Sequence, residues 1–417
     1  MENFTIIGGR RLSGKVEIEG AKNSILPILA ASILAKGKVE ILSCPKIKDV
    51  LNMIKILEYL GVETKFEENT LIIDNSSIQV KQIPKKLAEE LRASICFVGA
   101  LLSLSNQAKI AYPGGCSIGK RPVDIHLDAL RKLGVECKEY KNGIWCNAKK
   151  GIIGNRIILP FPSVGATENI MLASVFCRGK TIIHNCAKEP EIIDLANFIN
   201  SMGGKVLGAG TARIEIIGVD NLSATTYKPM ADRIEFGTYL ISAVITSGEV
   251  EIYNFKLKNI DNMLYKFLNN TCSISINNDI IYIKSNKVKN PFSFETGPYP
   301  NFPTDMQAQT MALLSVCEGK STIKETLFEN RFSHVNELVK MGADISVNGN
   351  VATINGVKCL HGEVVGANDL RGGASLVLAG LVAEGRTIVN NVHHIERGYL
   401  NMCEKLQGLG ADIIKNY

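Results

Sequence analysis

The sequence has few aromatic residues and no long run of positive charge. Aromatic residues make up 6% of the 417 residues, and Trp145 is the single tryptophan. Lys and Arg exceed Asp and Glu by 47 − 41 = 6, and these cations are dispersed along the chain. Proteins that bind nucleic acid concentrate basic residues and place aromatic residues among them. The composition therefore argues against a nucleic-acid partner.

The sequence also lacks a predicted signal peptide or membrane span. The start at Met1–Thr5 has no basic and apolar regions of the kind that direct secretion, and the most apolar stretches, such as Ile25–Leu34, are too short to cross a bilayer. The eleven cysteines include no CxxC pair. We therefore expect a reduced, cytoplasmic protein without membrane insertion, in which ten cysteines are small buried apolar residues.

Metal-binding spacings are absent as well. The six histidines form neither an HxH nor an HExxH pattern, and His126 is expected on a helix. No metal site and no cofactor is predicted.

The chain repeats a pattern with a period of about 70 residues. In each copy an apolar, helix-like run ends in a small turn and a strand follows. The turns contain Gly37, Asn106-Gln107, Gly179, Gly248, Gly319 and Gly385. A second helix in most copies ends in a hydrophobic residue followed by glycine, which predicts a left-handed helix C-cap. These glycines are Gly61, Gly134, Gly203, Gly342 and Gly410, and Leu268-Asn269 takes their place in one copy.

Six such units account for nearly the whole chain and predict an α/β fold. The first helices, for example 24–34, 94–104 and 306–316, are apolar nearly all round, so they are expected inside with the sheets outside. Three units can close around one core. With a boundary near Ser223–Pro229, we expect one domain over residues 21–229, and another over residues 1–20 and 230–417. The first strand, Phe4–Glu19, has no helix pair and is expected to pair with the last unit.

Cys116 differs from the other cysteines because it lies in a glycine- and proline-rich segment, Pro113–Asp124, which predicts a loop. Lys120 and Arg121 follow it closely. A thiol near fixed cations loses its proton more readily and becomes more reactive. The loop therefore suits chemistry on an anionic substrate.

Unusual polar residues recur at the predicted start of the first helix in each repeat. Helix N-termini favour anions, and added cations strengthen such a site. For single residues the alternatives are structural: Asp305 as a helix N-cap, Arg331 paired with Glu329, or Arg397 paired with Glu396. The recurring residues are Lys22, Asn23, Arg92, Thr167, Glu168, Asp232, Arg233, Asp305 and Arg371.

Several segments, in consistent order from Phe4 to the C-terminus, resemble the UDP-N-acetylglucosamine 1-carboxyvinyltransferase family of enolpyruvyl transferases. They are Gly20–Ser24, Arg92–Ser94, Pro113–Cys116, Gly119 with Arg121–Asp124, Pro162–Thr167, Lys188–Ile192, Phe302–Gln307, Glu329–Phe332, Asp369–Arg371 and Glu396–Gly398. Ala231, Glu396 and Phe236 depart from the usual pattern, and Ala231 and Phe236 leave the start of the fourth helix open.

The resemblance implies a two-domain inverse α/β barrel of six βαβαββ repeats, with the active site in the cleft between the domains. It implies transfer of the enolpyruvyl group of phosphoenolpyruvate to the 3-hydroxyl of UDP-N-acetylglucosamine, with release of phosphate. This is the first committed step of peptidoglycan synthesis, and hence of cell-wall biogenesis, cell shape and cell division. The antibiotic fosfomycin is expected to modify Cys116.

The resemblance also implies roles for single residues. Lys22, Arg121 and Arg397 hold phosphoenolpyruvate, while Asn23 and Arg92 border both ligands. Cys116 donates a proton to phosphoenolpyruvate and Asp305 accepts one from the sugar hydroxyl. The predicted catalytic residues are Cys116, Asp305, Lys22 and Arg397. Contacts to uridine diphosphate are expected from Arg121, Pro122, Val123, Asp124, Ile125, Ser163, Val164, Gly165 and Leu327, and further substrate contacts from Arg331 and Arg371.

Three alternatives remain from the sequence. The first is the sister transferase that acts on shikimate 3-phosphate, against which the Cys116 loop and Arg121–Asp124 argue. The second is a non-catalytic paralogue that binds the nucleotide sugar, against which the full set of catalytic residues argues. The third is a nucleic-acid-end enzyme built from similar repeats, which the composition disfavours.

Overall fold

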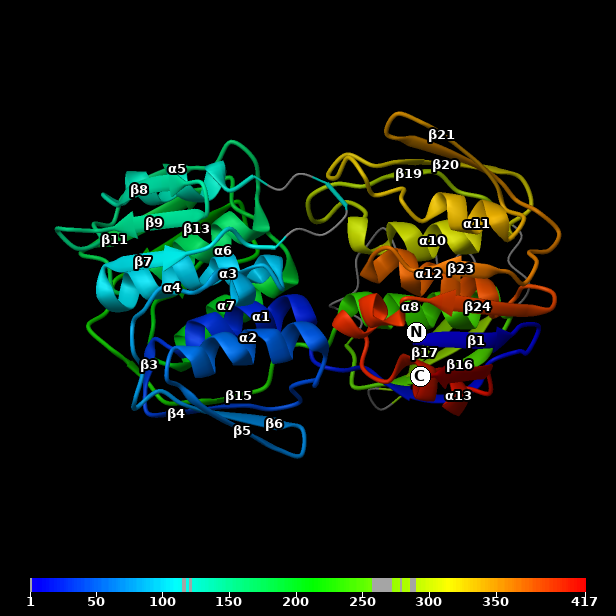
Figure 1. Ribbon diagram of the computed structural model, residues 1–417, viewed down its shortest axis with the longest axis horizontal. Coiled ribbons are helices and arrows are strands. Elements are labelled where there is room, and N and C mark those ends of the chain that lie inside the picture. Colours follow the sequence, from blue (N-terminus) through cyan, green and yellow to red (C-terminus); the bar gives the residue numbers. More distant parts are fainter. Residues whose placement is uncertain (1, 115–117, 120–121, 257–271, 278–279, 286–289) are drawn as a thin grey trace. The chain divides into compact units, whose positions relative to one another are not determined.

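The computed structural model describes residues 2–114, 118–119, 122–256, 272–277, 280–285 and 290–417 (Figure 1). The chain forms two compact units. The N-terminal unit lies within Gly20–Met230. The C-terminal unit contains Met1–Glu19 and Ala231–Tyr417, and Ile118 and Gly119 belong with it.

The N-terminal unit contains three repeats in the predicted order of helix, strand, helix and strands. The first has α1 (Lys22–Ser32), β3 (Ala35–Lys36), β4 (Lys38–Ile41), α2 (Lys48–Tyr59), β5 (Glu63–Glu67) and β6 (Thr70–Asp74). The second has α3 (Lys85–Ala88), η1 (Arg92–Ile95), α4 (Cys96–Ser105), β7 (Gln107–Ile110), α5 (Asp124–Lys132), β8 (Glu136–Tyr140) and β9 (Gly143–Asn147). The third has β10 (Arg156–Ile158), α6 (Val164–Ala173), β11 (Lys180–His184), α7 (Pro190–Ser201), β12 (Val206–Leu207) and β13 (Arg213–Ile217), and β14 (Leu222–Ser223) and β15 (Thr226–Tyr227) follow.

The C-terminal unit begins with β1 (Asn3–Ile7) and β2 (Ser13–Glu17). The described part of the fourth repeat has α8 (Arg233–Ile245), β16 (Glu249–Tyr253), β17 (Cys272–Asn277) and β18 (Ile280–Ser285). The fifth has β19 (Phe294–Glu295), η3 (Thr304–Met306), α10 (Gln307–Leu314), β20 (Lys320–Lys324), α11 (Val335–Lys340), β21 (Asp344–Asn348) and β22 (Val351–Asn355). The sixth has β23 (Val364–Gly366), α12 (Leu370–Gly380), β24 (Arg386–Asn390), η4 (Val392–Arg397), α13 (Met402–Gly408) and β25 (Asp412–Asn416).

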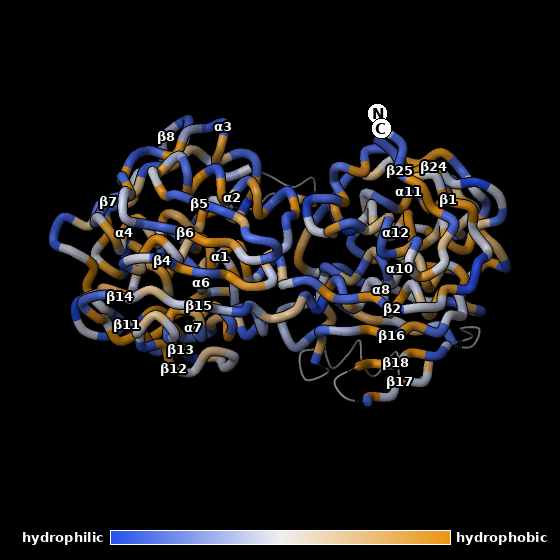
Figure 2. The backbone as a smooth tube through the Cα atoms, turned by 90° about the horizontal axis from the view of Figure 1, so that it is seen from below, coloured by the Kyte–Doolittle hydropathy of each residue, from blue (hydrophilic) through white to orange (hydrophobic). Residues whose placement is uncertain are grey.

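Helices inside and sheets outside is the arrangement found in the C-terminal unit. All residues of α8, α10 and α12 are buried, and these three helices pack against one another. Figure 2 shows them between the sheet of β24, β1 and β25 and the sheet of β16, β17 and β18. Apolar burial on every side of a helix requires such a central position, so the prediction of buried inner helices is confirmed.

Each repeat contributes one main sheet, and strands from elsewhere in the chain complete the sheets of the first, fourth and sixth repeats. In the first sheet, β15 pairs in parallel with β4. The segment Ser223–Pro229, proposed from the sequence as a linker, thus supplies an edge strand to the first repeat. Because β15 follows the third repeat and pairs with a strand of the first, it connects these two repeats.

The prediction of a single strand over Phe4–Glu19 is wrong in part. The strand β1 lies between β24 and β25 and pairs antiparallel with both, so pairing with the sixth repeat is confirmed. The following strand β2 instead pairs in parallel with β16 of the fourth repeat. The chain turns at Gly8, where an added Cβ would lie 2.3 Å from the carbonyl oxygen of Ala383, so the close approach there requires glycine.

The predicted left-handed helix ends are present. Gly61, Gly134, Gly203, Gly342 and Gly410 have φ between 83° and 99°. Asn106 also has a left-handed backbone, with φ of 60°. At the turn near Gly248 the left-handed residue is Ser247, with φ of 53°. Leu268 and Asn269 lie outside the described residues.

The start of the fourth helix, which the sequence left open, is well ordered by its own contacts. The Asp232 side chain caps α8 by accepting hydrogen bonds from the backbone N–H groups of Ile234 and Glu235. Phe236 is fully buried and stacks on Phe255 with ring centroids 4.0 Å apart. An aromatic residue at this position therefore fills the core.

Glu235 gives this helix start a pH-dependent contribution to stability. Its carboxylate is buried and accepts a hydrogen bond from Lys405 at 2.9 Å, and Lys405 also binds Glu19. Burial raises the pKa of Glu235 from 4.5 to about 7, although Lys405 opposes this shift. The pKa of Glu235 is higher in the folded than in the unfolded chain. Its contribution to the free energy of unfolding is therefore greatest below pH 4.5 and is lost as the pH rises through about 7.

Glu235→Gln is expected to remove this pH dependence. A pKa difference of about 2.5 corresponds to about 3 kcal/mol. The unfolding free energy of the wild type, relative to Glu235→Gln, is expected to fall by up to about 3 kcal/mol between pH 4.5 and pH 8. Urea denaturation over this range measures the difference, with Glu318→Gln at an exposed position as the control. Parallel curves for wild type and Glu235→Gln would contradict the expectation.

Candidate active site

Asp305 is the centre of a charged cluster in the C-terminal unit. Its Oδ1 accepts a hydrogen bond from Arg331 Nη2 at 2.9 Å, and its Oδ2 accepts one from Arg371 Nη2 at 3.0 Å. The two arginine side chains are each 3% exposed, whereas the Asp305 side chain is 28% exposed. Two buried cations therefore hold the Asp305 carboxylate in a partly exposed position.

Further contacts to the loop before α10 fix the Arg331 side chain. Its Nε and Nη2 donate to the Thr304 carbonyl oxygen at 3.2 and 3.0 Å. Its Nη1 lies 3.8 Å from Asp369 Oδ1. A guanidinium has five donors in one plane, and here they link Thr304, Asp305 and Asp369.

Asp369 starts the helix that carries Arg371. Its side chain accepts hydrogen bonds from the backbone N–H groups of Arg371 and Gly372 at 2.9 and 3.0 Å, which makes it the N-cap of α12. Burial would raise the pKa of Asp369, but the Arg331 charge and the two N–H groups lower it below its usual value. Asp369 therefore stays ionised and fixes the position of Arg371.

An aromatic and hydroxyl network supports the Arg371 guanidinium, which lies 5.4 Å from the centre of the Tyr399 ring. The Tyr399 hydroxyl is 2.8 Å from Thr238 Oγ1 and accepts a hydrogen bond from Gln309 Nε2 at 3.2 Å. Burial disfavours the charged form of Arg371, but Tyr399 and Asp305 outweigh it and raise its pKa. Neither Gln309, inside the buried helix α10, nor Tyr399, between η4 and α13, was singled out from the sequence.

The structural alternatives for Asp305 and Arg331 are wrong. The N-cap residue of η3 is Pro303 and that of α10 is Met306, so Asp305 occupies neither N-cap position. Arg331 binds Asp305 and Thr304 rather than Glu329. The Glu396 carboxylate pairs with Lys415. Long-range partners take the place of the local roles that the sequence offered for Asp305 and Arg331, and the role of Arg397 stays a prediction.

Glu325 is a further residue that sequence reasoning missed. Its buried carboxylate accepts hydrogen bonds from Thr304 Oγ1 and from the backbone N–H of Leu327, both at 2.9 Å. It therefore holds the predicted nucleotide contact Leu327 close to the loop that carries Asp305. Its position at the end of β20 gives no distinct sequence signal. Arg397, half-buried, ends η4, which packs against α12.

In the N-terminal unit, Lys22 and Asn23 are the first residues of α1. Lys22 Nζ lies 3.4 Å from Asp49 Oδ2, and the Lys22 side chain is 13% exposed. Asp49 lies in the first turn of α2 and is buried. Asp49 was not predicted, and it orients the ammonium group that the sequence assigns to phosphoenolpyruvate.

Arg92 starts η1 and reaches the next predicted contact segment. Its Nη2 donates to the Pro122 carbonyl oxygen at 3.0 Å. Val123 is buried directly before α5, which begins at Asp124, and Ile125 follows in its first turn. The structure thus brings Arg92 and the segment 122–125 together.

The second predicted nucleotide segment starts α6 beside α5. Ser163 caps α6 by accepting a hydrogen bond from the Ala166 N–H at 3.3 Å, and Val164 and Gly165 form its first turn. A Cβ added at Gly165 would lie 3.1 Å from the His126 ring. The glycine thus allows close packing that brings the starts of α5 and α6 side by side.

Two of the predicted site residues cannot be placed. Cys116 and Arg121 lie outside the described residues, as does Lys120. Their roles stay predictions. Of the ten described cysteines, nine are buried and Cys359 is half-buried.

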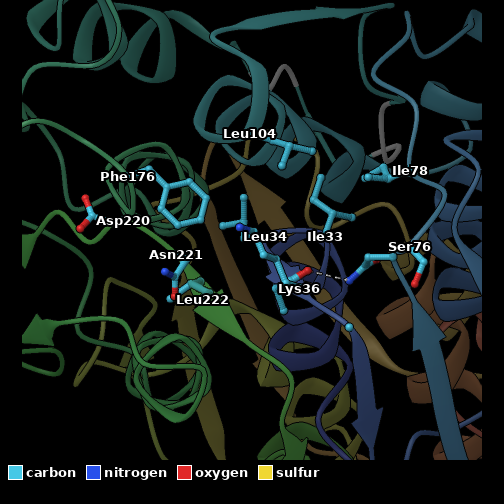
Figure 3. Close-up of a pocket in the computed structure, with 13 residues that line it drawn as sticks. Ile33, Leu34, Lys36, Ser76, Ile78, Leu104, Phe176, Asp220, Asn221 and Leu222 are labelled. Atoms are coloured by element: carbon cyan, nitrogen blue, oxygen red, sulfur yellow. Dashed lines mark hydrogen bonds between the residues drawn. The ribbon is translucent and has the colours of Figure 1, made fainter.

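A cavity of about 460 Å³ opens elsewhere in the N-terminal unit (Figure 3). Ile33, Leu104 and Phe176 supply apolar walls, and Lys36 is the only cation among the residues that line it. A multiply charged anion needs several cations, so this cavity does not suit phosphoenolpyruvate. It contains none of the predicted site residues.

Comparison with known proteins identifies the family. The family model described as EPSP synthase (3-phosphoshikimate 1-carboxyvinyltransferase) matches residues 6–406. The chain is 48% identical over 416 residues to UDP-N-acetylglucosamine 1-carboxyvinyltransferase 2 of Caldanaerobacter subterraneus, with 100% of both chains covered. The chain belongs to the UDP-N-acetylglucosamine 1-carboxyvinyltransferase family.

Other relatives and solved structures agree. A member of this family from Finegoldia magna is 46% identical, with 99% of this chain and 98% of the relative covered. The enolpyruvyl transferase NikO from Streptomyces tendae has a TM-score of 0.88 at 24% identity and covers 100% of this chain and 99% of its own. EPSP synthase from Acinetobacter baumannii has a TM-score of 0.78 at 16% identity, with both chains covered fully. These structures confirm the enolpyruvyl transferase fold predicted from the sequence.

Proposed function

We propose that this enzyme transfers the enolpyruvyl group of phosphoenolpyruvate to the 3-hydroxyl of UDP-N-acetylglucosamine and releases phosphate. The observation that carries this proposal is the full-length similarity, at 48% identity, to a relative named for this transfer to UDP-N-acetylglucosamine. The product is a precursor for peptidoglycan, so the enzyme acts in cell-wall synthesis.

The Asp305 cluster suits a group that receives a hydroxyl proton. Each carboxylate oxygen has two lone pairs, and Arg331 and Arg371 use one on each oxygen. The Asp305 side chain is 28% exposed, so its carboxylate is accessible to the sugar hydroxyl. Proton transfer to Asp305 becomes favourable as the hydroxyl gains acidity during its attack on C2.

The remaining steps follow from the charge on phosphoenolpyruvate. Cys116 protonates C3, which makes C2 electrophilic, and the sugar oxygen then bonds to C2 to give a tetrahedral adduct. The adduct loses phosphate while C3 is deprotonated again. Lys22, Arg121 and Arg397 stabilise the charge on the departing phosphate, and Asp49 orients Lys22.

A phosphate-release assay tests the proposed function. With phosphoenolpyruvate and UDP-N-acetylglucosamine, we expect steady phosphate release. With shikimate 3-phosphate as acceptor, we expect a rate at least about 100-fold lower, because a site fitted to one polar acceptor leaves its buried polar groups unpaired with another. Preference for shikimate 3-phosphate would assign the sister activity, and no release with either acceptor would favour a binding paralogue.

The proposed substrates are small molecules, and peptidoglycan precursors of this kind suggest a cytoplasmic location. Among the described residues, none of the helices combines the length and apolar character needed for a membrane span. The proposed reaction needs no cofactor, since the bonds formed and broken involve only the two substrates and protein side chains.

A further inference from the structure

Three side chains with metal-binding atoms, none of them part of the Asp305 cluster, meet in the C-terminal unit. The Cys359 thiol, a His361 ring nitrogen and a Glu384 carboxylate oxygen lie within 4.8 Å of one another. Cys359 is half-buried, and His361 and Glu384 are exposed. Cys359 and His361 lie between β22 and β23, and Glu384 lies between α12 and β24. The proposed transfer reaction uses none of the three.

Backbone hydrogen bonds hold the two segments together. The Gly362 N–H donates to the Glu384 carbonyl oxygen at 2.7 Å, and the Glu384 N–H donates to the Leu360 carbonyl oxygen at 2.8 Å. Leu360, between the two ligand residues, is fully buried. The His361 N–H donates to the Met341 carbonyl oxygen at 2.8 Å. The backbone therefore brings the three residues together before any ligand binds.

The approach of the two segments is close enough to require glycine. A Cβ added at Gly362 would lie 2.5 Å from the backbone of Arg386. Beyond this point β23 and β24 continue as a parallel pair. The cluster thus lies directly before this pair of strands.

We propose that Cys359, His361 and Glu384 bind one Zn²⁺ ion, with water in the fourth position. Thiolate, imidazole and carboxylate are the ligands that Zn²⁺ takes, at about 2.3, 2.0 and 2.0–2.2 Å. In a tetrahedral site such bonds place ligand atoms roughly 3.4–3.6 Å apart, so the cluster needs to contract by about 1 Å. The thiol disfavours Mg²⁺ and Ca²⁺, which prefer oxygen ligands.

Bound Zn²⁺ would link the segment before β23 to the turn before β24. Zn²⁺ binding is therefore expected to stabilise the C-terminal unit. Because the thiol must lose its proton to bind, affinity falls as the pH is lowered. The sequence did not reveal this site because Glu384 is remote in the chain from Cys359 and His361, and the pattern matches no known ligand spacing.

Cobalt and zinc titrations of the metal-free enzyme test the proposal. Co²⁺ is expected to bind with one equivalent and to give the intense thiolate-to-cobalt absorption band, which Zn²⁺ then displaces. Cys359→Ser, His361→Gln and Glu384→Gln are each expected to weaken Zn²⁺ binding at least about tenfold, since loss of even a supporting residue costs 10- to 100-fold. Glu363→Gln, an exposed neighbouring carboxylate outside the cluster, is the matched control and is expected to keep wild-type affinity.

Thermal melting distinguishes loss of the site from loss of the fold. Zn²⁺ is expected to raise the Tm of the wild type and of Glu363→Gln, but not of the three ligand variants, whose metal-free melting curves should match the wild type. Cys116→Ser retains the cluster and is expected to keep the cobalt band. A band that disappears in Cys116→Ser and persists in Cys359→Ser would overturn the proposal, as would the absence of stoichiometric binding.

Discussion

Asp305→Asn is expected to lower kcat by about 10²–10⁴-fold, the usual effect of removing a positioned general base. The KM for phosphoenolpyruvate is expected to change far less, because the assigned contacts to that anion are Lys22, Arg121 and Arg397. Steady-state kinetics with each substrate varied in turn measures both constants. The effect follows from the surface position of a carboxylate whose two arginine partners are buried.

Stability must be measured alongside these kinetics. Removing the Asp305 charge leaves two buried guanidinium groups less well paired, which is typically destabilising by about 3–5 kcal/mol. Asp305→Glu retains the charge but displaces it, so it is expected to recover stability more than rate. A folded Asp305→Asn enzyme with near-normal turnover would assign Asp305 to orienting Arg331 and Arg371, and leave the base unidentified.

Arg397→Ala provides the contrasting case. It deletes a proposed charge-assisted contact to phosphoenolpyruvate, so the KM for this substrate is expected to rise together with the loss of rate. Equal KM values in Arg397→Ala and the wild type would remove Arg397 from the set of binding residues.

Cys116→Ser is expected to lower the rate of phosphate release by about 10²–10⁴-fold, because a hydroxyl is a much weaker acid than a thiol. Cys116→Asp is expected to keep activity, since a carboxylic acid can also donate a proton, and to resist fosfomycin and other alkylating agents. Phosphate release with and without fosfomycin measures both properties. Equal inhibition of Cys116→Asp and the wild type would place the inhibitor elsewhere.

Brief, limiting alkylation of the wild type is expected to label Cys116 first. Burial raises the pKa of Cys44 and of Cys317 to about 12 and that of Cys403 to about 11, so these thiols react slowly. Cys359 is half-buried and is the main competitor. Peptide mapping decides between them, and label concentrated on Cys359 would contradict the expectation.

Features set by local chain chemistry could be predicted from the sequence. Gly61 and its counterparts end helices in a left-handed conformation because glycine has no Cβ. The inner helices α8 and α12 are buried on every side because they present no polar face. Repetition of these signals gave the six-unit α/β fold, and the resemblance gave the family and its reaction.

Contacts between distant residues were decided only by the tertiary structure. Asp305 binds Arg331 and Arg371, which lie 26 and 66 residues away. The sequence offered a helix cap for Asp305 and Glu329 for Arg331, because spacing reveals only local partners. A buried guanidinium must find a carboxylate wherever the fold brings one. The packing of η3 against α8 and α10, and of α10 against α12, therefore selected these pairs. The same reason explains why Asp49, Glu325 and Glu384 became visible only once separate segments had been brought together.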